Sequence, residues 1–150
     1  MSIFRKKDYF STEEQQRIVS AIKAAEQQTS GEVRVYIEKR CRYVDPLDRA
    51  AELFLGLKMD QTAEHNGVLV YLAYKDRQFA ILADKGIHQK VGDAFWQQEV
   101  NVMKTHFVQE KPALAIEHVV TDIGKALHTH FPYNSAIDKN ELPDDIIFGR

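Results

Sequence analysis

Residues 68–73, which follow Gly67, are apolar at every position, and this run constrains the fold more than any other part of the chain. A strand that is apolar on both faces is typical of the centre of a sheet covered by helices. Only residues 74–77 separate it from a second run, Gln78 to Ala83. A parallel return would need a crossover of a dozen or more residues, so the two runs must pair as an antiparallel hairpin.

Helical patterns surround this hairpin. Ser11 followed by Glu14 matches a capping box and predicts a helix over about residues 11–28. Asp45 and Pro46 supply an N-cap and a first-turn proline for a second helix, which should end near Met59. Apolar residues at helical spacing then predict two more helices after the hairpin, around residues 96–107 and 116–127.

Alternation from Val33 to Ile37 predicts one further strand. The order is then helix, strand, helix, strand, strand, helix, helix, which predicts an α/β fold: a three-layer α/β/α sandwich with a small mixed β-sheet. The first two strands should be parallel, with a right-handed crossover, and the third antiparallel. We assign residues 10–132 to this domain, 1–9 to an N-terminal segment and 133–150 to a polar C-terminal tail.

Composition argues against several classes of function. The net charge is -2, from 20 basic and 22 acidic residues, and the sequence lacks the basic stripe that binding to nucleic acid requires. We therefore expect no nucleic acid as a partner. The one cysteine, Cys41, excludes an internal disulfide and a Cys-x-x-Cys motif. No run approaches the roughly 20 apolar residues that span a bilayer, so we expect a soluble, cytoplasmic protein without direct membrane insertion.

Three polar motifs lie where a helix or turn meets a strand: residues 29–32, 65–67 and 84–86. Because the first two strands are parallel, Glu32 and Asn66 start them at the same edge of the sheet. The hairpin reverses the chain and brings Asp84 back to that edge. Asp60 and Glu64, in the loop before the second strand, should lie there too.

Several carboxylates at one edge repel one another, so they either spread into solvent or share a hard cation such as Ca²⁺ or Mg²⁺. The first hypothesis is therefore a divalent-metal site with Glu32, Asp60 and Asp84 as ligands, where Asn66 or the Gly86 backbone orients a substrate. The alternative is that these residues only cap strands and make turns. No catalytic residue is assigned.

Other motifs are incomplete. Cys41 lies between two arginines, but the arginine that a cysteine phosphatase loop needs six positions later is Leu47 here. The six histidines contain no i, i+4 pair for zinc, and no phosphate-binding glycine loop occurs. No nucleotide, haem or zinc is expected. Lys75, Asp76 and Arg77 are interpreted as a solvated hairpin tip.

Between about Phe10 and Phe131 the chain carries an ordered set of short motifs: Thr29-Ser30-Gly31-Glu32, Thr62, Asn66-Gly67-Val68-Leu69, Asp76-Arg77, Phe79-Ala80-Ile81, Asp84-x-Gly86-Ile87 and Phe95-Trp96. Together these motifs resemble the TPM domain family. The tail Asn140-Glu141-Leu142-Pro143-Asp144 is similar to that of small soluble bacterial members. In place of an acidic residue common after the Gly86 turn, this chain has His88.

The resemblance implies an α/β/α sandwich and, in some members, calcium binding or acid phosphatase activity. In other members it implies an auxiliary or assembly role at membranes. Two hypotheses follow. The first is the divalent-metal site, with or without hydrolysis of phosphate monoesters. The second is a non-catalytic module that docks onto a protein partner and assists the assembly or repair of a membrane protein complex.

Overall fold

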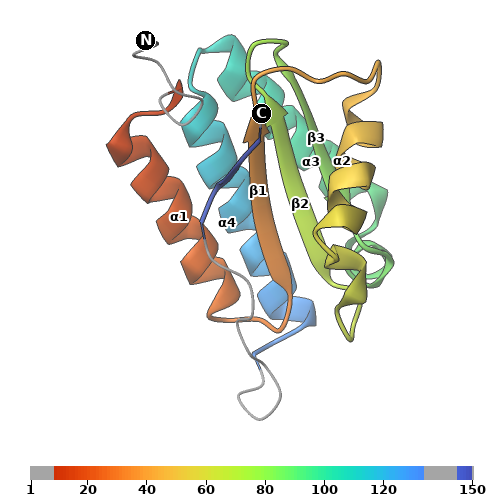
Figure 1. The fold of residues 1–150 in the computed structure, drawn as a ribbon. Helices are drawn as coiled ribbons and strands as arrows, with labels where there is room; N and C mark the ends of the chain where they lie inside the picture. The colour runs from red at the N-terminus through yellow and green to blue at the C-terminus, as the bar shows by residue number, and fades with distance from the viewer. Residues whose placement is uncertain (1–8, 134–144, 150) are drawn as a thin grey trace.

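The central sheet has four strands in the order β3-β2-β1-β4, with helices on both faces (Figure 1). The structure, a computed structural model, describes residues 9–133 and 145–149. In chain order the elements are α1 (Thr12–Glu26), β1 (Glu32–Glu38), α2 (Pro46–Gly56), the 3-10 turn η2 (Met59–Gln61), β2 (Gly67–Ala73), β3 (Gln78–Ala83), α3 (Lys85–Val108), α4 (Pro112–His130) and β4 (Ile147–Phe148).

The predicted strand directions are confirmed. β1 and β2 are parallel, with Glu32 opposite Gly67, and β2 and β3 form the antiparallel hairpin, with Val68 opposite Ala83. The α/β sandwich with a small mixed sheet is therefore confirmed as the fold class. One strand is added to it, because β4 pairs parallel with the outer side of β1 at Tyr36 and Ile37.

Local sequence signals explain where the first two helices begin. The Ser11 hydroxyl accepts a hydrogen bond from the Glu14 N–H at 3.1 Å, and the Glu14 carboxylate accepts one from the Ser11 N–H at 2.8 Å. This capping box satisfies two N–H groups that a helix start would otherwise leave open. The Asp45 carboxylate caps α2 in the same way, accepting from the Leu47 N–H at 2.9 Å.

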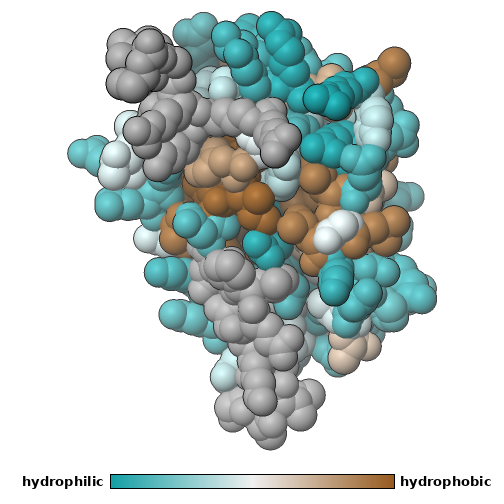
Figure 2. All heavy atoms as spheres, in the orientation of Figure 1, coloured by the Kyte–Doolittle hydropathy of each residue, from teal (hydrophilic) through white to brown (hydrophobic). Residues whose placement is uncertain are grey.

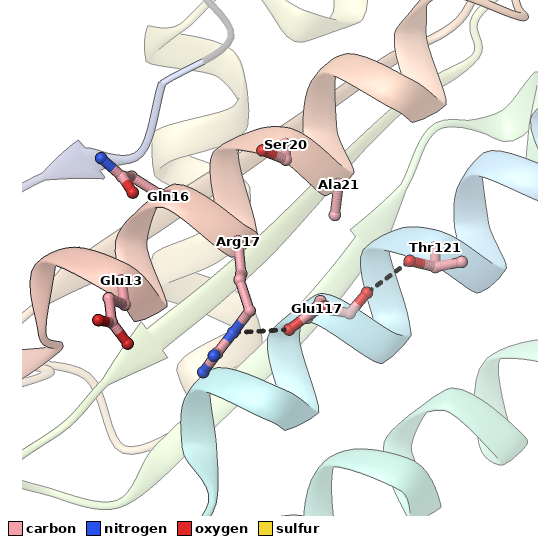
Figure 3. A pocket seen from close by; sticks show the side chains of 7 residues that line it. All are labelled: Glu13, Gln16, Arg17, Ser20, Ala21, Glu117 and Thr121. Atoms are coloured by element: carbon pink, nitrogen blue, oxygen red, sulfur yellow. Dashed lines mark hydrogen bonds and ion pairs between the residues drawn. The ribbon is translucent and has the colours of Figure 1, made fainter.

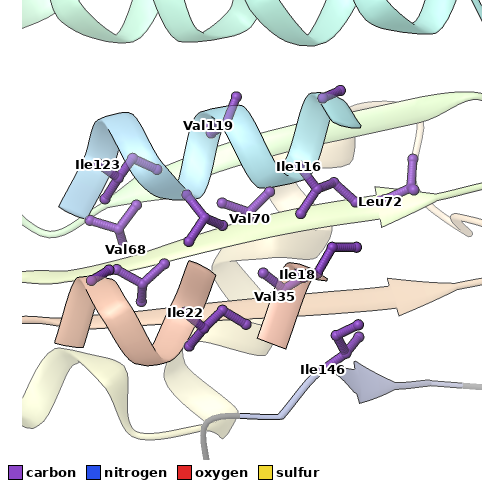
Figure 4. Packing of buried hydrophobic residues seen from close by; sticks show 14 of the residues in the cluster. Ile18, Ile22, Val35, Val68, Val70, Leu72, Ile116, Val119, Ile123 and Ile146 are labelled. Atoms are coloured by element: carbon purple, nitrogen blue, oxygen red, sulfur yellow. The ribbon is translucent and has the colours of Figure 1, made fainter. Parts of the chain in front are cut away.

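Strand alternation divides the hydrophobic core between two faces of the sheet. On one face, the larger cluster joins α1, α4 and α3 to inward-facing residues of the strands (Figure 4). On the other face, α2 and η2 cover a smaller cluster over β2 and β3. The larger cluster includes Ile18, Ile22, Val35, Val68, Val70, Leu72, Ile116, Val119, Ile123 and Ile146.

Two features differ from the sequence prediction. The segment assigned to a polar tail contributes the buried Ile146 and strand β4, because three apolar residues, 146–148, follow its acidic part. Residues 1–8, 134–144 and 150 lie outside the described part, so the rest of the assigned tail and the N-terminal segment are not compared. The other difference is in α3, which begins directly after Asp84 and kinks at Gly92, where φ is 77°.

The outer edge of β1 is closed in two ways. β4 covers its C-terminal half, where the Gly149 N–H donates to the Ile37 carbonyl at 2.8 Å. Near its start, the Val33 N–H donates to the Glu26 carboxylate at 2.9 Å. A side chain at the end of α1 thus takes the place of a neighbouring strand.

No helix among the described residues is both long enough and apolar enough to cross a bilayer.

Candidate functional site

The three polar motifs meet at one edge of the sheet, where β1 and β2 start and β3 ends. We call this edge the acidic rim and define it by Ser30, residues 64–66 and residues 84–86. The Ser30 hydroxyl donates to the Glu64 carboxylate at 2.8 Å and accepts from the Asn66 side-chain N–H at 3.2 Å. The predicted convergence of these loops is confirmed by these contacts.

Asp84 joins the end of β3 to this rim. One carboxylate oxygen caps α3 by accepting from the Lys85 N–H at 2.8 Å. The other lies 3.3 Å from Nδ1 of His65. The Asp84 N–H itself donates to the Gly67 carbonyl at 2.9 Å. The side chain is therefore held by a helix start on one side and an imidazole on the other.

Gly86 allows the first turn of α3 to press against the loop before β2. A Cβ atom at this position would lie 2.1 Å from the Glu64 carbonyl oxygen and 2.5 Å from that of His65. Both contacts are with backbone, which cannot rotate away. The close approach also lets the Ile87 N–H donate to the His65 carbonyl at 3.2 Å. Any side chain at residue 86 would push α3 away from the rim.

Asn66 is the one rim side chain that is fully buried, with 1% of its surface exposed. Its backbone N–H donates to the Thr62 hydroxyl at 3.1 Å, and its side-chain N–H donates to Ser30. The side-chain oxygen, Oδ1, has no hydrogen-bond partner among the described residues. A buried acceptor without a partner costs free energy, so this oxygen calls for an explanation.

Glu32 and Asp60 lie nearby but belong to the α2 side of the sheet. Glu32 pairs with Gly67 in the strand register, and its N–H donates to the Asn66 carbonyl at 3.3 Å. Asp60 lies in η2, beside Met59, whose carbonyl oxygen closes over Gly67. Within the described ranges, no three His, Cys, Asp or Glu side chains are grouped as a metal site. Glu32, Asp60 and Asp84 therefore do not form a ready-made three-carboxylate cluster.

Sequence reasoning placed Ser30, Glu64 and His65 in the segments that meet at this edge but gave none of them a role in the site. Ser30 and Glu64 are 34 positions apart, and their hydrogen bond appears only once β1 and β2 are paired. His65 has a positive φ of 52°, and its ring Nδ1 lies 3.3 Å from the Asp84 carboxylate. The sequence signal that could have identified His65 as a site residue is its position directly before Asn66-Gly67, in a turn motif.

A second polar network, at the opposite end of the sheet, was also missed. The Arg49 guanidinium makes two hydrogen bonds to the buried Glu38 carboxylate, at 2.9 and 3.0 Å, and the Tyr71 hydroxyl donates to the same carboxylate. The bond to Glu38 raises the pKa of Arg49, and burial together with the bond to Glu38 raises the pKa of Tyr71. Every charge in this network is paired, so we interpret it as structural.

The remaining candidates are also structural. Asp76 accepts from the Cys41 N–H at 2.7 Å and pairs with Arg40 at 3.1 Å, which ties the hairpin tip to the loop after β1. A shallow groove between α1 and α4 is lined by polar side chains, among which Arg17 pairs with Glu117 at 3.6 Å (Figure 3). The rings of His106 and His118 lie 5.2 Å apart across α3 and α4, a pair that sequence spacing could not reveal.

Comparison with known proteins gives a family and a close structural relative. A family model described as the TPM domain matches residues 3–126. The structure of the BA42 protein from Bizionia argentinensis is 39% identical and superposes with a TM-score of 0.85, over 97% of this chain and 99% of that one. The N-terminal domain of cg2496 from Corynebacterium glutamicum shares the fold at 19% identity, with a TM-score of 0.60, over 79% of this chain and 74% of that one.

No curated protein sequence matches the chain significantly. The family model nevertheless spans most of the sequence, and the BA42 structure matches this chain over almost the full length of both. The resemblance stated from the motifs is thus confirmed, and the chain belongs to the TPM domain family.

Proposed function

We propose that the acidic rim binds one divalent cation, Ca²⁺ or Mg²⁺, with the Asp84 carboxylate and the Asn66 side-chain oxygen as protein ligands. The observation that carries this proposal is the buried Oδ1 of Asn66, which lacks a partner among the described residues. A cation would satisfy it. The neighbouring oxygens of Ser30 and Glu64 belong to the ligand class that hard cations take.

The proposal does not need three carboxylates in contact. Mg²⁺ keeps several of its waters and is usually bound through one or two carboxylates, and Ca²⁺ accepts carbonyl oxygens and water as well. In this arrangement Glu32 and Asp60 act through bound water and add negative potential. The Gly86 backbone keeps the start of α3 close enough for Asp84 to reach the ion.

Calorimetric titration with CaCl₂ and MgCl₂ tests the site. Asp84→Asn is the informative variant because asparagine caps helices about as well as aspartate, so the start of α3 is kept while the charge is lost. We expect the dissociation constant to rise about tenfold or more, as for loss of one charged ligand contact worth about 1.5–3 kcal/mol. Asp48→Asn, an exposed acid on α2, is the matched control.

A second variant separates ligation from folding. Asn66→Asp has nearly the same shape but turns the unpartnered oxygen into a charged ligand, so we expect tighter cation binding and a larger rise in melting temperature on adding calcium. Unmutated protein that gives no more heat than buffer with either cation would refute the proposal. So would an Asp84→Asn variant that binds as tightly as the parent.

Hydrolysis of phosphate monoesters is the second candidate function, and the His65–Asp84 pair is the observation that favours it. With the proton on Nδ1, His65 donates to the Asp84 carboxylate at 3.3 Å, which leaves Nε2 for proton transfer. A bound cation beside this pair would neutralise a phosphate group. An imidazole held in this way has an unprotonated Nε2, so it can act as a general base that takes a proton from an attacking water.

Release of p-nitrophenol from its phosphate ester, with and without Mg²⁺ or Ca²⁺, tests the second function. His65→Asn suits the backbone because asparagine tolerates positive φ. We expect kcat to fall about 100-fold, the lower range for general acid–base catalysis, while cation binding stays intact. Equal turnover by the variant would exclude His65 from proton transfer, and the proposal that the acidic rim binds a cation would be unaffected.

A further inference from the structure

Exposed apolar side chains gather at the end of the domain opposite the acidic rim. We call it the hairpin end and define it by residue 9, loops 39–45, 74–77 and 108–111, and the starts of α2 and α4 (Figure 1). Phe79, just after the hairpin tip, stacks on Phe107 at 5.5 Å, which brings the α3–α4 turn to this end. Of eight exposed large hydrophobic side chains in the described ranges, six lie here: Tyr9, Tyr43, Val44, Leu47, Val108 and Leu114.

Two of these side chains project almost fully into solvent. Val44 is 98% exposed in the loop between β1 and α2, and Val108 is 84% exposed at the end of α3. A small apolar protrusion surrounded by hydrophilic atoms is visible over the β1–α2 loop (Figure 2). Neither valine belongs to a core cluster of the described domain. They stand on separate loops and do not form one flat patch.

Basic side chains surround these tips. The three loops carry six exposed basic residues: Lys39, Arg40, Arg42, Lys75, Arg77 and Lys111. They carry only three acids, of which Asp76 is bound to Arg40 and Cys41 and Asp45 caps α2. Although the whole chain has a net charge of -2, this end is therefore positive.

We propose that the hairpin end docks onto an anionic lipid bilayer, with Val44 and Val108 entering the headgroup region and the basic side chains contacting lipid phosphates. Basic residues near a negatively charged leaflet and apolar side chains at the boundary are the two contributions that hold peripheral proteins on membranes. A protein interface would need a contiguous, well-packed core. Separate apolar tips on two loops suit a fluid surface better.

The sequence before Tyr9 is also basic, with three basic residues and one acid at positions 5–8. Tyr9 stacks on Tyr74 with ring centroids 4.3 Å apart, so the first described residue lies beside the hairpin tip. In the sequence, Arg5, Lys6 and Lys7 precede Asp8 and Tyr9. Clusters of basic residues next to an exposed apolar element are typical of segments that bind anionic lipids.

Co-sedimentation of the full chain with vesicles tests the proposal. We compare phosphatidylcholine vesicles with vesicles that also contain phosphatidylglycerol, in buffer with a chelator so that no cation bridges protein and lipid. We expect binding to the anionic vesicles only, weakening steeply with added NaCl. The double variant Val44→Ser, Val108→Ser should bind about tenfold more weakly with an unchanged salt dependence, because it loses apolar burial alone.

The pair Arg42→Gln, Lys75→Gln should also weaken binding about tenfold or more, and should flatten the salt dependence. Leu55→Ser, at the far end of α2, and Lys125→Gln, on α4, are matched controls that should bind like the parent. No binding to anionic vesicles would overturn the proposal. Unchanged binding by the double valine variant would also overturn it, because the attraction would then depend on charge alone. Equal binding to an acidic peptide would point to a protein partner instead of a bilayer.

Discussion

At the scale of single residues, Glu99 shows the clearest conflict between burial and charge. It lies where α3 packs on α4, is 2% exposed, and has one carboxylate oxygen without a partner among the described residues. Burial, and then the neighbouring Asp122 carboxylate, raise the pKa of Glu99 to about 8. At neutral pH the folded protein therefore keeps this side chain largely protonated.

This carboxyl predicts how stability depends on pH. Between about 4.5, the ordinary pKa, and about 8, the folded protein holds a proton that the unfolded chain has released. The free energy of unfolding should therefore fall as pH rises through this window, by up to about 1.4 kcal/mol per pH unit. Glu99→Gln should remove this slope and be more stable than the parent at pH 8. Urea unfolding at several pH values measures it.

The control for that experiment is Glu110→Gln, an exposed residue in the α3–α4 turn. It should follow the parent at every pH. If Glu99→Gln lost as much stability as the parent between pH 5 and pH 8, the slope would come from other groups.

Gly86 gives a second prediction at this scale. Because its missing Cβ would meet two carbonyl oxygens, Gly86→Ala should destabilise the protein by about 2 kcal/mol or more. Gly56, at the end of α2, has nothing within 4 Å of its Cβ position. Gly56→Ala should be neutral or stabilise by about 0.5–1 kcal/mol. Thermal unfolding of the two variants compares them directly, and equal effects would contradict the close approach at Gly86.

The site could be located from the sequence, although its contacts could not. Asp84 and Asn66 were predicted to meet because a hairpin between two known runs fixes chain direction. The Ser30–Glu64 hydrogen bond and the buried state of Asn66 depend on loop geometry that spacing does not encode. The roles of Glu32, Asp60 and Asp84 as metal ligands stay predictions.

At the scale of elements, β4 is the part whose stability contribution can be isolated. It pairs with β1 at only two positions, while Ile146, just before it, is 6% exposed in the larger core cluster. We expect Ile146→Ala to cost about 2–4 kcal/mol, as for truncation of a buried isoleucine. Ile147→Ala, on the opposite face and half-buried, should cost clearly less. Chemical denaturation gives both values, and equal costs would mean that β4 is not docked through Ile146.

The elements differ in how well sequence predicts them. β2 and β3 were predictable because runs of six or more apolar or alternating residues leave no other arrangement, and α1 because its capping box is explicit. β4 was missed because its two residues follow an acidic stretch and pair with a strand over 100 positions earlier. The Gly92 kink was missed because a glycine inside a helical pattern does not by itself specify a bend.

At the scale of the whole molecule, the larger core cluster joins α1, α3, α4 and every strand, so the domain should unfold as one unit. Trp96, the only tryptophan, packs at the edge of this cluster in α3, whereas circular dichroism reports all helices. We expect the two signals to give the same urea midpoint. A tryptophan transition at clearly lower urea would mean that α3 leaves the domain before the rest unfolds.

The contact between Glu26 and the Val33 N–H has a consequence for storage and engineering of the protein. An open strand edge is a template on which a second molecule can add its own strand, and this is how many soluble domains begin to form fibrils. Here the Glu26 carboxylate accepts the hydrogen bond from the Val33 N–H, so this donor is not open to a strand from a second molecule. Shortening residue 26 would expose that template, so designers who alter α1 should keep an acidic side chain there.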